Sequence, residues 1–220
     1  MKILCVSDLE VSFLNSPLVA LRFRDVEAVL SCGDLSHNYL EYITSMLNVP
    51  TYFVHGNHSH QVDLGSGVMR TSPWGAVDLH RRSVTGPSGL VMAGIEGCLQ
   101  YNRGAFQYSQ SEMWSMVWQL APMLMLNKVR FGRFLDVFVS HAPPWGIHDQ
   151  PDRPHNGIKA FRWLIKVFKP AFHLHGHIHV MNPATLTASL VDKTHVINAY
   201  RFRELDIPMD CIKIRPIVFA

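Results

Sequence analysis

Six short polar stretches each follow a run of apolar, β-branched-rich residues. They are Ser7-Asp8-Leu9-Glu10, Gly33-Asp34, Gly56-Asn57-His58, Ser140-His141, Gly176-His177 and the neighbouring His179. Carboxylates, an amide oxygen and imidazoles occur together in this set, and these groups suit Mn, Fe or Zn. We therefore expect two divalent metal ions as cofactors, with Mn as the first expectation and Fe or Zn as alternatives.

A pair of metal ions of this kind would serve the hydrolysis of phosphoesters. A phosphodiester resists water because its anionic oxygens repel a nucleophile and its alkoxide is a poor leaving group. Two cations about 3.5–4 Å apart neutralise the phosphate and lower the pKa of a bound water. Asp34 is the candidate bridging ligand, because a carboxylate has two oxygens and the preceding Gly33 allows a close backbone approach. Asp8, at the end of the first predicted strand, would bind one ion.

The remaining candidates complete the two ligand sets. His177 and His179 are separated by one residue, so in extended backbone they project to the same side and can reach adjacent ions. Asn57 would offer its side-chain oxygen to the second ion, and His141 would complete that set. His58 would stand beside the substrate and protonate the departing oxygen as a general acid.

Each candidate also has a structural interpretation. Asp8 or Asp34 alone would read as a helix cap, and a lone His58 or His141 as a structural residue. The metal interpretation depends on all of them following buried-type strands. Of the other histidines, His173 and His175 lie within an apolar strand, where core or supporting roles are expected. Solvent-facing or core positions are expected for His37, His55, His60, His80 and His195.

The elements that must position these residues can be predicted from the apolar pattern. Residues 2–7, 26–32 and 51–54 read as buried strands, and residues 36–47 have helical spacing with Ser36 as the cap. This β-loop-α-β order predicts largely parallel strands whose carboxyl ends share one rim, where open α/β sheets bind ligands.

The rest of the chain continues the alternation of strands and helices. Residues 74–95 read as short strands that form a hairpin with its turn at 86–89, and residues 109–131 as a helix that Pro122 should kink or divide. Its methionines, Met113, Met116, Met123 and Met125, are expected to line the core. A strand at 135–139, a helix at 160–168 and a strand at 171–175 should follow. Strands at 186–191, 194–200, 202–207 and 212–218 should close the domain as an antiparallel sheet.

Length and composition limit the class of protein. A chain of 220 residues suits one domain, 1–220, and 48% hydrophobic residues is ordinary for a globular protein. No apolar run reaches the ~18 residues of a membrane span, and the start lacks the pattern of a secretory signal, so a soluble, cytoplasmic protein without a membrane partner is expected. The four cysteines are widely spaced, which argues against disulfides and structural zinc. A net charge of +3 with scattered Lys and Arg argues against a nucleic-acid partner and leaves a small phosphoester as the expected substrate.

The ordered set Asp8-x-Glu10, Gly33-Asp34, Gly56-Asn57-His58, His141 and Gly176-His177-Ile178-His179 resembles the calcineurin-like metallophosphoesterase family, whose pattern is D-x-H, G-D, G-N-H-D/E, H, G-H-x-H. The resemblance implies an α/β (α+β) fold, a two-sheet β-sandwich flanked by helices. It also implies a dinuclear metal centre with a bridging hydroxide and hydrolysis of phosphomonoesters or phosphodiesters. Residues 141–147, with His155-Asn156-Gly157 after them, look like the small cytoplasmic phosphoesterases of that family, so His155 is expected near the phosphate.

The sequence departs from the family pattern at two positions. Glu10 stands where a histidine ligand is usual, which adds negative charge at one ion. Ser59 replaces the acidic residue that would orient His58, and Asp63 or another acid is the alternative for that task. A nuclease on the same centre and a metal-binding scaffold with little activity remain rival functions. His58 argues against a pure scaffold, which has no need of a general acid.

Overall fold

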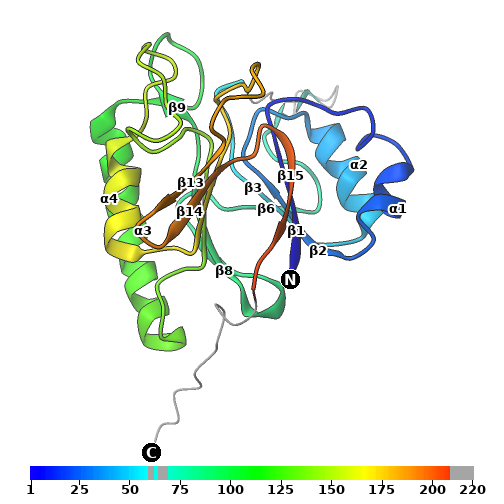
Figure 1. Ribbon diagram of the computed structural model, residues 1–220, viewed down its shortest axis with the longest axis horizontal. Coiled ribbons are helices and arrows are strands. Elements are labelled where there is room, and N and C mark those ends of the chain that lie inside the picture. Colours follow the sequence, from blue (N-terminus) through cyan, green and yellow to red (C-terminus); the bar gives the residue numbers. More distant parts are fainter. Residues whose placement is uncertain (59–61, 64–68, 209–220) are drawn as a thin grey trace, which may run out of the picture.

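The computed structural model describes residues 1–58, 62–63 and 69–208 of the chain, and two stacked β-sheets form its centre (Figure 1). The first sheet has the order β15 (Arg201–Asp206), β1 (Lys2–Ser7), β2 (Val26–Ser31), β3 (Thr51–Phe53) and β6 (Ala76–Asp78). The second has the order β13 (Ala188–Val191), β14 (Thr194–Asn198), β12 (Phe172–His175), β11 (Val137–Ser140), β8 (Val91–Ile95) and β7 (Ser83–Thr85). The predicted two-sheet sandwich flanked by helices is confirmed.

Both sheets are built around parallel strands. In the first sheet β1, β2, β3 and β6 run parallel, and in the second β8, β11, β12 and β14 do so. Strands with helices or sheets on both faces are nearly apolar along their length, which explains why β1 and β11 read as apolar runs and why β2 does so apart from the exposed Glu27. The prediction that the carboxyl ends of these strands share a rim is confirmed, because the polar residues that follow them meet there.

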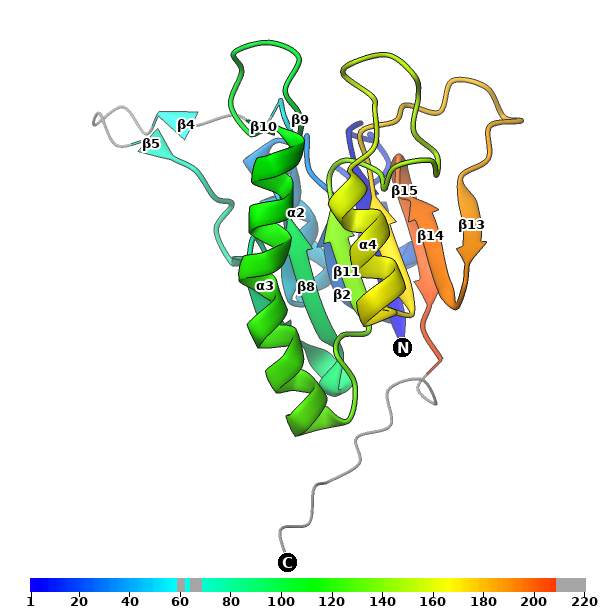
Figure 2. The same cartoon turned by 90° about the vertical axis from the view of Figure 1, so that its left-hand side faces the viewer.

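Helices cover the outer face of each sheet. The helices α1 (Leu18–Arg22) and α2 (His37–Leu47) lie on the first sheet, and α3 (Gln110–Phe131) and α4 (Lys159–Phe168) lie side by side on the second (Figure 2). One buried cluster, which includes Ile3, Leu30 and Val139, fills the space between the sheets. Two further clusters lie beneath the two pairs of helices. Burial on both faces fixes the sheets, and with them the positions of their strand ends.

Local signals explain where the helices begin. Ser36 caps α2, because its Oγ accepts a hydrogen bond from the backbone N–H of Tyr39 at 3.3 Å, as predicted. Ser109 and Glu112 form a capping box at the start of α3. The predicted alternative of two helices is wrong, since α3 runs through Pro122 as one element. Burial of its inner face, which includes Leu120 and Leu124, outweighs the one backbone hydrogen bond that a proline removes.

The methionines of α3 are divided between the core and the surface. Met113 and Met116 are buried and Met123 packs against the same cluster. The expectation for Met125 is wrong, because its side chain is 56% exposed. Met125 follows Leu124 on the helix, and the turn of about 100° between consecutive helical residues carries it out of the buried face.

The last strands do not form one antiparallel sheet. Strand β13 pairs antiparallel with β14, but β14 adds parallel to β12, and β15 crosses to the first sheet and pairs antiparallel with β1. The predicted strand at 212–218 lies outside the described residues. Two small pairs complete the described strands, β4 (Val62–Asp63) with β5 (Met69–Arg70) and β9 (Cys98–Leu99) with β10 (Gln107–Tyr108), and a 3-10 turn at Pro87–Gly89 joins β7 to β8 as the expected hairpin.

Cys5, Cys32 and Cys98 are buried free thiols, and Cys211 lies outside the described residues. In the part of the chain that the structure describes, no helix is both long enough and apolar enough to span a membrane.

Candidate metal centre

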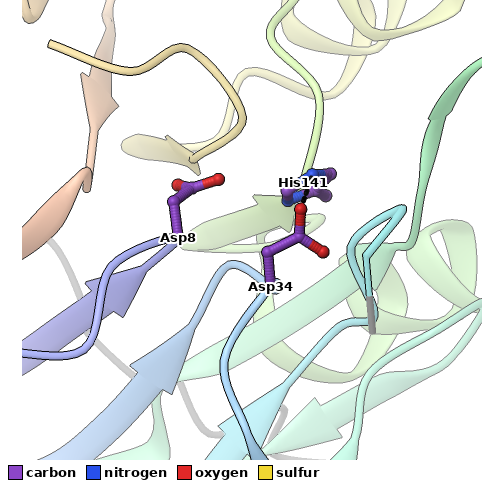
Figure 3. Close-up of side chains that lie close together, drawn as sticks. All are labelled: Asp8, Asp34 and His141. Carbon is purple, nitrogen blue, oxygen red and sulfur yellow. Dashed lines mark ion pairs between the residues drawn. The ribbon is translucent and has the colours of Figure 1, made fainter. Parts of the chain in front are cut away.

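Asp8, Asp34 and His141 come together at the shared rim of the two sheets. One oxygen or nitrogen from each of them lies within 4.8 Å of the others (Figure 3). Asp8 follows β1, Asp34 lies just beyond β2, and His141 follows β11 of the opposite sheet. Residues far apart in the sequence therefore meet because the parallel strands that carry them end at the same edge.

The backbone turns sharply as it leaves these strands. The backbone is left-handed at three residues, with φ values of +65° at Asp8, +56° at Asp34 and +67° at His177. Residues other than glycine rarely adopt this region. Hydrogen bonds hold the turns: the Asp8 carboxylate accepts from the backbone N–H of His177 at 2.9 and 3.0 Å, and Asp34 Oδ1 accepts from the N–H of His58 at 2.7 Å. Such strain concentrates at functional sites, and here it aims both carboxylates inward.

Two glycines leave room for the carboxylates. A Cβ at Gly56 would overlap the carboxylate of Asp34, and one at Gly176 would lie 2.5 Å from Asp8 Oδ2. The glycines of the G-N-H and G-H-x-H stretches are thus required for close backbone approach to the centre.

The buried His141 connects the two carboxylates electrostatically. Its Nδ1 donates to the Cys32 carbonyl at 2.8 Å, and its Nε2 lies 3.2 Å from Asp34 Oδ2 and 2.9 Å from Asn57 Oδ1. Burial alone would lower the pKa of His141, but the charges of Asp34 and Asp8 outweigh it and raise that pKa to about 9. Burial alone would raise the pKa of Asp34, but the charge and hydrogen bond of His141 lower it to about 2.

The donor set fits divalent metal ions. Burial raises the pKa of Asp8, and the nearby charge of Asp34 adds to the rise, because two anionic carboxylates repel each other in a poorly solvated place. A divalent cation would relieve this repulsion. The hydrogen bond from Nδ1 of His141 to Cys32 leaves Nε2 as its ligand atom, once the proton there is displaced.

His177 is a second buried imidazole of the centre. Its Nε2 donates to the Pro154 carbonyl at 2.8 Å, and its ring centroid lies 4.8 Å from that of His141. Burial lowers its pKa to about 3, so the ring is neutral at physiological pH and offers Nδ1 as a ligand atom. The premise that His177 and His179 share an extended backbone is wrong, because β12 ends at His175 and His177 is left-handed. His179 nevertheless reaches the centre, with Nε2 3.9 Å from Asp8 Oδ1.

Asn57 is buried in the site, whereas the neighbouring His58 is exposed. The Asn57 amide is fixed at both ends, since Oδ1 accepts from His141 and Nδ2 donates to the hydroxyl of Tyr101 at 3.0 Å. His58 is exposed and lines a cleft of about 320 Å³ together with Asp8, Asp34 and His179. The general-acid candidate thus lines the same cleft as both carboxylates of the cluster.

Glu10 and His155 lie at the margins. Glu10 lines the same cleft, and its Oε1 accepts from the backbone N–H of Ser36, the cap of α2, at 3.2 Å. His155 has its ring centroid 5.2 Å from that of His177, and its Nδ1 lies 2.6 Å from Asp152 Oδ2. Both are therefore next to the cluster but outside the tight group of Asp8, Asp34 and His141. Ser59 and His60 lie outside the described residues.

Sequence reasoning missed three partners of the site: Tyr101, the Pro154 carbonyl and His148. Nδ1 of His148 lies at hydrogen-bond distance, 2.9 Å, from Nε2 of His175, and this contact joins residues 144–157 to the end of β12. His173 and His175 are buried, as expected, and His173 lies 2.8 Å from the Ser140 hydroxyl. No local pattern marks Tyr101, Pro154 or His148, because each acts through a loop whose path is set by distant contacts.

Comparison with known proteins places this arrangement in a family. The family model for calcineurin-like phosphoesterases matches residues 1–181. No curated protein matches the chain. Similar solved structures include TT1561 of Thermus thermophilus, at 14% identity and a TM-score of 0.58 over 91% of this chain and 89% of that one. They also include GAP50, the anchor in the inner membrane complex of Plasmodium, at 15% identity and a TM-score of 0.50 over 90% and 70%. The calcineurin-like phosphoesterase YfkN from Bacillus subtilis is similar at 11% identity and a TM-score of 0.50 over 98% and 88%. These likenesses show the fold, and the match to the family model shows that the chain belongs to the calcineurin-like phosphoesterase family.

Proposed function

We propose that this chain hydrolyses a small phosphomonoester or phosphodiester with the help of two divalent metal ions. Manganese is the metal we propose, with iron or zinc as alternatives. The observation that carries the proposal is the meeting of Asp8, Asp34 and His141, two of whose members, Asp8 and Asp34, line a cleft together with His58. Like-charged carboxylates are buried together where a cation would be favourable, and an exposed imidazole stands beside them.

The ligands divide into two sets around Asp34. The first ion would take Asp8, Asp34, His179 and, where its side chain reaches, Glu10, and the second would take Asp34, Asn57, His141 and His177. The two Asp34 oxygens face different neighbours, Oδ1 the backbone of His58 and Oδ2 the ring of His141, which supports a bridging position. When bound, the ions would neutralise the phosphate and lower the pKa of a coordinated water.

His58 is proposed to donate the proton that the leaving oxygen needs. Its backbone is held by Asp34, while its side chain is exposed in the cleft. A general acid must reach the departing oxygen without itself being a ligand, and this combination of a fixed backbone and a free ring meets that requirement. His155 is proposed to lie near the phosphate, beside His177.

A small substrate is favoured over a nucleic acid. The cleft that Asp8, Asp34 and His58 line has a volume of about 320 Å³, which suits a small molecule. The sequence has a net charge of only +3, and a protein that follows a nucleic-acid backbone usually presents a concentrated basic surface.

Metal analysis followed by a substrate panel tests the proposal. The purified protein, its chelated form and the chelated form with added manganese should be assayed on bis(4-nitrophenyl) phosphate, 4-nitrophenyl phosphate, cyclic nucleotides and single-stranded DNA. Chelation should abolish hydrolysis and manganese should restore it. Full activity after complete metal removal would refute the mechanism. Cleavage of DNA alone would favour the nuclease, and bound metal without any hydrolysis would favour a scaffold.

A matched histidine pair sharpens this test. His58→Ala should retain its metal and lose hydrolysis, whereas His195→Ala should retain both, because His195 is an exposed residue of β14 that stacks on Phe172. Equal effects of the two substitutions would remove His58 from the reaction.

A further inference from the structure

A second cleft, of about 300 Å³, opens beside the metal centre. One wall comes from the segment between β9 and the start of α3, including Gln100 and Gln110, and the other from Arg153 and Asn156 in the connection between β11 and α4. Both segments rise at the same end of the molecule (Figure 2).

Each wall is joined directly to the centre. Gln100 precedes Tyr101, whose hydroxyl accepts from Asn57 Nδ2 at 3.0 Å. Arg153 precedes Pro154, whose carbonyl accepts from His177 Nε2 at 2.8 Å. The two walls are therefore each one residue away from a partner of a candidate ligand of the second ion, which puts this cleft on the side of the centre that holds Asn57 and His177.

Part of the lining is already engaged and rigid. Gln110 joins the two walls, because its Nε2 donates to the Gly157 carbonyl at 2.9 Å and its Oε1 accepts from the Lys159 N–H at 3.1 Å. Tyr108 donates its hydroxyl to Glu96 at 2.6 Å. These hydrogen bonds within the protein fix the positions of Gln110 and Tyr108, so neither side chain needs a ligand as its partner.

Three other polar side chains of the cleft are free. Within the described residues, the side chains of Gln100, Arg153 and Asn156 make no hydrogen bond or ion pair with the protein. A guanidinium with no carboxylate partner is a strong binder of anions, because its planar donors match a carboxylate or a phosphate. The two amides add donors and acceptors for neighbouring hydroxyl or carbonyl groups.

We propose that this cleft binds the organic portion of the substrate, and that this portion carries a second anionic group, a carboxylate or a further phosphate, which Arg153 binds. The proposal rests on the proposed phosphoesterase function, since it places the hydrolysed phosphate at the metal centre. The substrate class is therefore a phosphoester with two anionic ends. Gln100 and Asn156 would select polar groups close to the second anion.

The test uses three compounds that differ only in this group. Glycerol 3-phosphate and 3-phosphoglycerate have the same phosphate and carbon chain, but the second ends in a carboxylate. Glycerol 1,3-bisphosphate supplies a phosphate in that place and keeps the C2 hydroxyl. Affinity for the manganese-loaded protein is measured by calorimetry and kcat/KM by phosphate release. The two anionic compounds show which anion the cleft prefers.

Affinity and kcat/KM are expected to be about 10-fold higher for a compound with a second anionic group than for glycerol 3-phosphate. This value is at the low end for charge-assisted hydrogen bonds, because Arg153 is exposed. Arg153→Gln should remove the preference and Arg153→Lys should retain part of it. Arg130→Gln is the matched control, because Arg130 is an exposed arginine of the last turn of α3. It should leave the preference unchanged.

Two outcomes would overturn the inference: no preference for either anionic compound, or a preference that survives Arg153→Gln. Failure of the proposed function looks different. If the loaded protein hydrolyses no phosphoester but still binds the anionic compounds more tightly through Arg153, the cleft stands and the phosphoesterase does not. If it hydrolyses nitrophenyl esters without any anion preference, the phosphoesterase stands and this cleft does not bind a second anion.

Discussion

Removal of the metal should expose a pH dependence of stability that comes from the Asp34–His141 pair. His141 is buried and its pKa is raised from 6.5 to about 9, chiefly because the carboxylates of Asp34 and Asp8 overcome the effect of burial. Between these two pH values the folded state holds a proton that the unfolded state has lost. The free energy of unfolding must therefore fall as pH rises from 6.5 through 9, and below 6.5 this contribution is fully present.

The size of the fall follows from the pKa. Each tenfold change in proton affinity is worth about 1.4 kcal/mol, so the rise of the His141 pKa corresponds to about 3 kcal/mol. Urea unfolding of chelated protein at about pH 6.5, 7.5 and 9 measures it. Bound manganese should remove the dependence, because a coordinated imidazole has already given up the proton.

Asp34→Asn supplies the control for this assignment. It removes the largest attraction for the His141 proton, so most of the fall should disappear in the chelated variant, even if its overall stability is lower. A flat profile for the chelated wild type, or the same fall in Asp34→Asn, would show that this pair does not carry the effect. The slope with pH decides the matter, since the absolute stability of a variant also changes for other reasons.

Three further outcomes are expected. His58→Ala should keep its metal but lose on the order of 10²–10⁴ in kcat for an alkyl ester and much less for a nitrophenyl ester, whose leaving group barely needs a proton; similar losses on both would point to a binding role. If Glu10 coordinates a metal ion, Glu10→His should raise the affinity for zinc relative to manganese and shift the alkaline limb of the pH–rate profile to lower pH. Unchanged metal content with a small loss of stability would show instead that Glu10 serves only as the hydrogen-bond acceptor of the Ser36 N–H at the start of α2. Tyr101→Phe removes the acceptor of the Asn57 Nδ2 hydrogen bond and should lower the affinity for the second ion by about 10-fold in a metal titration. An unaltered affinity would show that Asn57 binds without this hydrogen bond.

Much of the fold could be predicted from local pattern. Apolar runs fixed by burial on both faces mark β1, β2 and β11, and Ser36 marks the start of α2. The pairing of the last strands could not be predicted in this way. Strand β15 has only exposed and half-buried residues, as an edge strand does, and its place beside β1 depends on which edge is left open after the parallel strands have packed.

The sequence by itself determined the candidate ligands, because polar residues at the ends of buried strands must gather where parallel strands end. The tertiary structure decided which of them meet and which other groups they contact. It placed Asp34 against His141, left Glu10 at the margin, and brought the Tyr101 hydroxyl and the Pro154 carbonyl to Asn57 and His177. The reason is physical: hydrophobic periodicity records whether a residue is buried, whereas contacts between distant loops arise only when the packing of all the layers fixes their paths.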